Sequence, residues 1–235
     1  MANQYPPPPP GGGWSPPAGA AADPYAPERA LQGWAQSRGV TINASPDVRW
    51  FSSWGPFVYL PAFHRVGREA RARIAEGPTE ASAFVVETFE GDPIKQATGD
   101  DRLLVAFVTS PRLAYRAAVR SRSGGNVVDD FARGLDAIVG GGPSPGSVLG
   151  DPTFERVFDV GAPTRDEGNA ALPIALRQTL LQSGFRGVLE LRPGGLICAL
   201  YDRRAFDPVT LDALLGAVAR IHQLATQYAV TPAPP

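Results

Sequence analysis

The sequence has one cysteine, Cys198, and two histidines, His64 and His222, among 235 residues. A lone cysteine excludes an internal disulfide framework and a multi-cysteine zinc or iron–sulfur site within one chain. Neither histidine has a second histidine or a carboxylate at the spacing of a metal-binding helix. We therefore expect neither a metal nor another cofactor.

Long apolar runs and a strong net charge are also missing. The apolar run Leu103–Val108 is far shorter than the roughly 18–20 residues that cross a bilayer. The sequence does not begin with basic residues followed by an apolar stretch, so it gives no indication of a secretory signal. The net charge of −1 gives no overall attraction to nucleic acid or acidic membranes. These absences predict a cytoplasmic protein without a membrane span, with nucleic acid disfavoured as a partner.

Proline and glycine are abundant at the start of the chain and between its two halves. Nine prolines fall within residues 1–27, which hold too little apolar surface to offset the entropy of ordering. We expect residues 1–27 to be a disordered tail, 28–139 a β-rich N-terminal domain, 140–150 a linker, 151–228 an α+β C-terminal domain and 229–235 a second tail.

The sequence of the N-terminal half predicts a small antiparallel sheet or a partly open barrel with flanking helices. A helix is expected from Pro27 to Arg38, followed by Gly39. Alternating or continuous apolar patterns bounded by turn residues then predict strands over 68–74, 83–89, 103–109 and 113–119. Apolar residues at helical spacing predict a second helix over 126–139.

The C-terminal half predicts a β-α-β-β-α module, so that the whole chain belongs to the α+β class. The expected elements are a strand over 154–160, a helix over 169–183 interrupted by Pro173, a hairpin of strands 187–191 and 196–200, and a helix over 208–228. The last helix has the strongest signals, because Asp207 can cap it and Pro208 suits its first turn.

This order of elements, with the sequence Phe154–Val160 at its start, resembles the C-terminal domain of an uncharacterised bacterial family of unknown function. The resemblance covers residues 151–228 only. Members of that family often carry membrane-spanning helices ahead of the domain, and this sequence has none. The family implies no known reaction, so the resemblance assigns no catalytic residue.

Aromatic residues are concentrated in one segment, 50–63. It holds six of the chain's aromatic side chains, namely Trp50, Phe51, Trp54, Phe57, Tyr59 and Phe63. Prolines and a glycine break the segment into short extended pieces, which makes it a poor membrane helix. It is either a wall of the core or a contact surface, since aromatics are enriched at interface hot spots.

Four arginines beside Tyr115 form a candidate anion-binding strip: Arg112, Arg116, Arg120 and Arg122. In a strand, the last three share one face and suit an anionic ligand or RNA. No recognition-module signature accompanies them.

Patterns that suggest catalysis have simpler explanations. Gly142–Gly146 matches the G-x-S-x-G pattern of a nucleophile elbow, but Pro145 lacks the backbone N–H that the oxyanion hole requires. Cys198 lies in an apolar strand, where burial raises the pKa of a thiol and leaves it unreactive. The pairs Asp100-Asp101 and Asp129-Asp130 suit a turn and a helix start.

The sequence therefore predicts a non-enzymatic protein that binds a protein partner or a second copy of itself, with segment 50–63 as the possible interface. The alternative is a hydrolase or transferase of unrecognised type, with carboxylates and arginines between the two halves.

Overall fold

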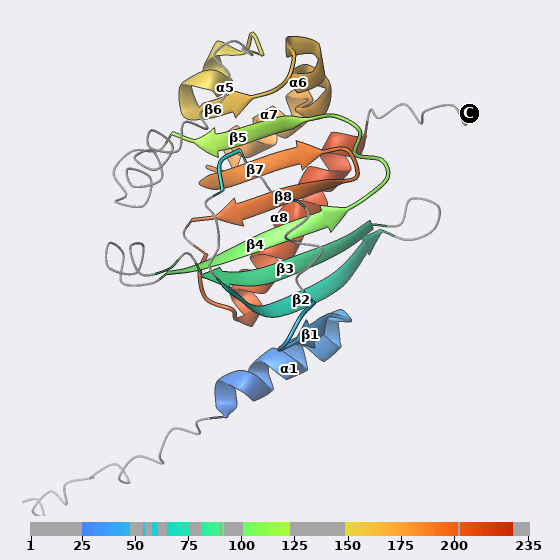
Figure 1. Ribbon diagram of the computed structural model, residues 1–235, viewed down its shortest axis with the longest axis vertical. Coiled ribbons are helices and arrows are strands. Elements are labelled where there is room, and N and C mark those ends of the chain that lie inside the picture. Colours follow the sequence, from blue (N-terminus) through green and yellow to red (C-terminus); the bar gives the residue numbers. More distant parts are fainter. Residues whose placement is uncertain are drawn as a thin grey trace, which may run out of the picture.

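The computed structural model describes residues 25–47, 54, 58–60, 65–75, 81–89, 91, 101–122, 149–201 and 203–227. Within this part of the chain, eight strands form one open antiparallel sheet of order β1-β2-β3-β4-β8-β7-β5-β6 (Figure 1). The strands are β1 (Thr41–Asn43), β2 (Arg65–Ala75), β3 (Ala81–Phe89), β4 (Arg102–Thr109), β5 (Ala117–Ser121), β6 (Phe158–Gly161), β7 (Gly187–Arg192) and β8 (Gly195–Leu200). The α+β class and an antiparallel sheet are confirmed, and the sheet is not a closed barrel.

The described helices are α1 (Ala26–Arg38), α5 (Pro152–Val157), α6 (Arg165–Ala171), α7 (Ile174–Gln182) and α8 (Pro208–Thr226). Helix α8 crosses one face of the sheet, where it contacts β2, β3, β4 and β8 (Figure 1). Helix α1 packs on α8 near β1, and α7 packs between α5 and α8. None of the helices in the described ranges is long and apolar enough to span a membrane.

The start of α8 shows how local sequence fixes its position. The Asp207 side chain accepts a hydrogen bond from the backbone N–H of Thr210 at 2.8 Å, and Pro208 occupies the first turn. This cap satisfies a backbone donor that the helix itself leaves free. Leu211, Leu214 and Val218 then face the sheet and are fully buried. The expected final helix is confirmed.

Both faces of the sheet are buried at its centre. Along β4, Leu104, Ala106 and Val108 join the core cluster under the helices, whereas Leu103, Val105 and Phe107 join a second cluster on the opposite face with Tyr59 and Leu60. A strand buried on both sides has no polar face, which explains the continuous apolar sequence of Leu103–Val108.

Two expected strands differ from the structure. Residues 152–157 form α5 rather than a strand, because Asp151 caps the helix by accepting from Phe154 N at 3.1 Å and Pro152 occupies its first turn. Strand β6 starts only at Phe158, so the β-α-β-β-α order is not confirmed. Strand β5 starts at Ala117 instead of residue 113, because the Leu113 N–H bonds the Ser110 carbonyl at 3.2 Å in a turn.

Residues 28–139 and 151–228, expected as two domains, contribute strands to the same sheet. Strand β4 pairs with β8, with Val105 opposite Ala199. Strand β5 pairs with both β6 and β7. The core cluster under the helices contains residues of both ranges. The expected tail 1–27 is too long by three residues, because Tyr25 caps α1 and the helix begins at Ala26, with Pro27 in its first turn. Residues 1–24, the tail 229–235, the helix over 126–139 and residues 140–148 of the linker lie outside the described residues.

Candidate binding pocket

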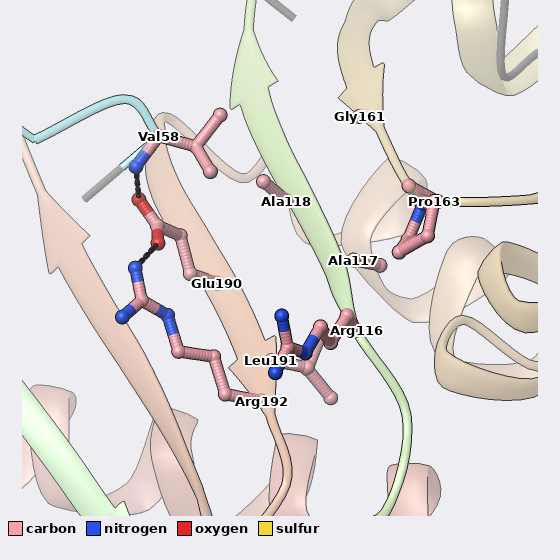
Figure 2. Close-up of a pocket in the computed structure, with 10 residues that line it drawn as sticks. Val58, Arg116, Ala117, Ala118, Gly161, Pro163, Glu190, Leu191 and Arg192 are labelled. Carbon is pink, nitrogen blue, oxygen red and sulfur yellow. Dashed lines mark hydrogen bonds and ion pairs between the residues drawn. The ribbon is translucent and has the colours of Figure 1, made fainter. Parts of the chain in front are cut away.

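A cavity of about 500 Å³ lies beside β5, where this strand runs between β6 and β7. Its lining comes from both halves of the chain and from the aromatic segment (Figure 2). The lining residues are Val58, Arg116, Ala117, Ala118, Gly161, Ala162, Pro163, Glu190, Leu191 and Arg192.

The register of three strands creates this space. Ala118 is paired with Glu190 of β7 on one side and with Gly161 of β6 on the other. Directly paired residues in antiparallel strands share one face of the sheet. The methyl group of Ala118 next to Gly161, which has no side chain, leaves a hollow on this face. Glu190, on the other side of Ala118, forms the opposite wall.

Glu190 is the buried charge of the pocket, with 1% of its surface exposed. One carboxylate oxygen, Oε1, accepts hydrogen bonds from the backbone N–H groups of Val58 at 2.7 Å and Tyr59 at 3.0 Å. The other, Oε2, pairs with Arg192 Nη2 at 2.9 Å (Figure 2). A buried carboxylate needs such partners to offset its desolvation. Both oxygens are thus engaged in holding the pocket together.

Arg192 extends this arrangement to Trp54. Its Nη1 donates a hydrogen bond to the Trp54 carbonyl, while its Nη2 is bound to Glu190. Trp54 and residues 58–60, hereafter the strap, are therefore fixed to β7 by one carboxylate and one guanidinium. Sequence reasoning missed both residues. The signal was present, because Glu190 is a charged residue within the apolar strand Val188–Leu191.

Arg116 supplies the second positive charge of the lining. Its backbone N–H donates to Glu167 Oε1 at 3.0 Å, which fixes the chain just ahead of β5. Its side chain is exposed. Among the described residues, no carboxylate forms an ion pair with the Arg116 guanidinium. This cation is consequently the group in the pocket that can accept an anion without breaking an existing ion pair.

Of the four arginines expected to form an anion-binding strip, Arg120 and Arg122 lie together at Asp159, whereas Arg112 is bound elsewhere. Arg112 donates to the Thr226 carbonyl at the end of α8, at 2.7 Å. Arg120 and Arg122 both pair with Asp159, at 3.3 and 2.8 Å. Of the four, Arg116 is the one that lines the pocket. Pairing across β5 and β6 thus places a carboxylate beside two of the cations, which sequence alone did not reveal.

Two of the six aromatics of segment 50–63 are described, and both face the core. The Trp54 ring packs edge-to-face on Phe107, with centroids 5.7 Å apart and an angle of 87° between the rings. A side chain at Gly195 would overlap the Trp54 ring. Tyr59 is 4% exposed. These two rings act as a wall of the core. Trp50, Phe51, Phe57 and Phe63 lie outside the described residues.

Cys198 and His222, a thiol and an imidazole that could in principle act as nucleophile and base, are both buried. Burial raises the pKa of the Cys198 thiol to about 12, so the thiolate that would attack a substrate does not form near neutral pH. His222 Nε2 lies 2.9 Å from Ser110 Oγ. This serine and histidine are 2% and 6% exposed, and Pro111 after the serine has no N–H for an oxyanion. The pair is a core hydrogen bond.

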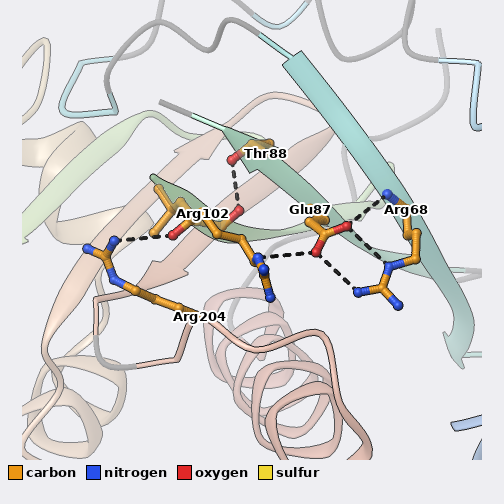
Figure 3. A network of polar contacts seen from close by, with 6 residues as sticks. Arg68, Glu87, Thr88, Arg102 and Arg204 are labelled. Atoms are coloured by element: carbon orange, nitrogen blue, oxygen red, sulfur yellow. Dashed lines mark hydrogen bonds and ion pairs between the residues drawn. The ribbon is translucent and has the colours of Figure 1, made fainter. Parts of the chain in front are cut away.

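Glu87 forms a second buried polar cluster near the start of α8 (Figure 3). Its carboxylate pairs with Arg68 at 3.2 Å and with Arg102 at 3.4 Å. Arg204 donates to the Arg102 carbonyl at 3.2 Å and so connects the β8–α8 loop to β4. The cluster ties three strands to that loop, and every one of its labelled side chains has a partner within the fold.

Within the described residues, no group of three or more histidine, cysteine, aspartate or glutamate side chains is placed to hold a metal ion. His64, Asp100, Asp129, Asp130 and Ser144 lie outside those residues. Comparisons with protein-family models, with curated proteins and with solved structures found no match. The resemblance of residues 151–228 to an uncharacterised bacterial family therefore stays a prediction.

Proposed function

We propose that the protein is a non-enzymatic binding protein, and that its ligand carries an anionic group that Arg116 receives in the pocket between β5, β6 and β7. The exposed Arg116 guanidinium beside an apolar cavity is the observation that carries this proposal. Ligand pockets combine mostly apolar walls with a few placed polar groups. This cavity has that composition.

Binding fits the pocket better than the alternative of a hydrolase or transferase. The pocket does hold a carboxylate and two arginines from the two halves, as that alternative requires. Glu190, however, is only 1% exposed, and its two oxygens already accept hydrogen bonds from Val58, Tyr59 and Arg192. The carboxylate is used for structure, and Arg116 is left for recognition.

Association with a protein partner or a second copy through residues 50–63 stays a prediction. The rings of Trp54 and Tyr59 face the sheet, so they do not support an aromatic interface. Val58 is the described residue of the strap that is exposed, at 38%, and it lines the pocket. A partner that contacts Val58 would meet the molecule at the pocket.

The proposal is tested with 8-anilinonaphthalene-1-sulfonate, an anionic dye whose fluorescence rises in apolar sites. We expect saturable binding to the full chain and at least roughly tenfold weaker binding to Arg116→Gln, because a charge-assisted bond to the sulfonate contributes about 1.5–3 kcal/mol. The matched control is Arg156→Gln, an exposed arginine of α5 outside the pocket. Equal dye affinity of the two variants would refute the proposal.

A further inference from the structure

Two charged side chains of the pocket neutralise each other. Arg192 contributes one positive charge and Glu190 one negative charge, and their ion pair is 2.9 Å long. Among the described lining residues, the remaining charge is that of Arg116. A ligand with one negative charge matches this part of the lining, because a second anionic group would meet no unpaired cation there and would approach the buried carboxylate of Glu190.

The other described residues of the lining offer no polar side chain. The seven other residues are Val58, Ala117, Ala118, Gly161, Ala162, Pro163 and Leu191. None of these seven residues has a side-chain hydroxyl, amide, imidazole or carboxylate. Their side chains therefore cannot replace the hydrogen bonds that a sugar or a nucleobase makes with water. Buried polar groups of a ligand without a partner cost free energy. The wall therefore favours a hydrocarbon body over a sugar or a nucleoside.

The size of the cavity fits such a body. A volume of about 500 Å³ lies within the range of roughly 300–1,000 Å³ that is common for small-molecule pockets. The small side chain of Ala118, beside Gly161 on the face that also holds Glu190, leaves this space open. Acetate or inorganic phosphate would occupy only a fraction of it.

From the charge, the walls and the volume, we infer that the ligand is an amphipathic organic acid, with one carboxylate at Arg116 and an apolar chain or ring in the hollow beside Ala118 and Gly161. This inference rests on the proposed function and narrows it to one chemical class. Arginine suits a carboxylate because its planar fork can form two parallel hydrogen bonds with it.

Isothermal titration of the full chain with acetate, hexanoate, octanoate, 1-octanol and inorganic phosphate tests the inference. Each methylene that enters the pocket should tighten binding roughly three- to fourfold, so octanoate should bind far better than acetate. Octanol should bind at least about tenfold more weakly than octanoate, because it lacks the charge. Arg116→Gln should weaken octanoate by a similar factor, and Arg156→Gln should leave it unchanged.

The outcomes separate the two proposals. If acetate or phosphate binds as tightly as octanoate, and Arg116→Gln weakens that binding, the amphipathic class is wrong and the anion site stands. If octanol equals octanoate, or if Arg116→Gln binds every anion as well as the unmodified chain, the anion site is wrong as well. Near-ultraviolet circular dichroism of each variant confirms that the fold is retained in the comparison.

Discussion

At the scale of single residues, burial decides what the titratable groups of this protein can do. His222 shows this clearly. His222 belongs to α8, and its ring is buried. The hydrogen bond to Ser110 satisfies one ring nitrogen. Burial first, and the nearby positive charge of Arg112 second, lower the pKa of His222 below the ordinary value of 6.5. The folded state therefore prefers the neutral ring.

This shift predicts how stability depends on pH. Above pH 6.5 the histidine is neutral in both states and contributes no pH dependence. As the pH falls below 6.5, the unfolded chain binds a proton that the folded protein resists, so the free energy of unfolding decreases until the folded pKa is passed. In His222→Gln, the free energy of unfolding should no longer show this decrease between pH 6.5 and the folded pKa. Urea unfolding of both proteins at several pH values between 7.5 and 5 measures it, and parallel curves would contradict the pKa shift.

At the scale of elements, the attachment of the strap depends on one carboxylate. Glu190 binds two backbone N–H groups of the strap and orients Arg192 toward the Trp54 carbonyl. The strap covers the sheet face that contains Val105 and Phe107. Loss of the carboxylate charge would weaken all three contacts, because hydrogen bonds to a charged group are stronger than neutral ones.

We therefore expect Glu190→Gln to lower the free energy of unfolding by about 1.5–3 kcal/mol. The backbone amides of Val58 and Tyr59 should also exchange with solvent faster, because their acceptor is weaker. Chemical denaturation and amide exchange measured by NMR test these effects. Glu28→Gln, at the exposed start of α1, is the matched control. Unchanged exchange at residues 58 and 59 would show that the strap is held by other contacts.

Element signals in the sequence predicted much of the architecture and little of the pocket. The Asp207-Pro208 start of α8 and the apolar run of β4 are local patterns, so they can be found without a fold. Asp151-Pro152 is the same kind of signal, yet the β-rich sequence after it led to the wrong prediction of a strand. The pocket depends on the pairing of Ala118 with Glu190 and Gly161, which no local pattern encodes.

At the scale of the whole molecule, the sheet order makes the two halves of the chain depend on each other. Strand β8 lies between β4 and β7, and β5 lies between β7 and β6. A fragment that ends in the region 140–148 would expose one edge of β4 and leave β5 with none of these partners. The complementary fragment would keep the pair of β7 and β8, but it would lack β4 beside β8 and β5 between β6 and β7.

We predict that fragments 1–145 and 146–235 do not fold separately and recover the native structure when combined. Circular dichroism and urea unfolding of each fragment, alone and as an equimolar mixture, test this. The separate fragments should show no cooperative transition, and the mixture should show one. A cooperative transition in either fragment alone would mean that it forms a domain without the other.

The position of β8 also affects the growing chain during synthesis. Val105 can pair with Ala199 only after the ribosome has added about 90 more residues. At a synthesis rate of roughly 5–20 residues per second, this delay is about 5–20 seconds. During that time one edge of β4, which contains the apolar run Leu103–Val108, has no neighbour in the sheet, and unpaired apolar edges are sites of aggregation. The central place of a late strand therefore leaves an apolar edge open in the nascent chain until β8 has been made.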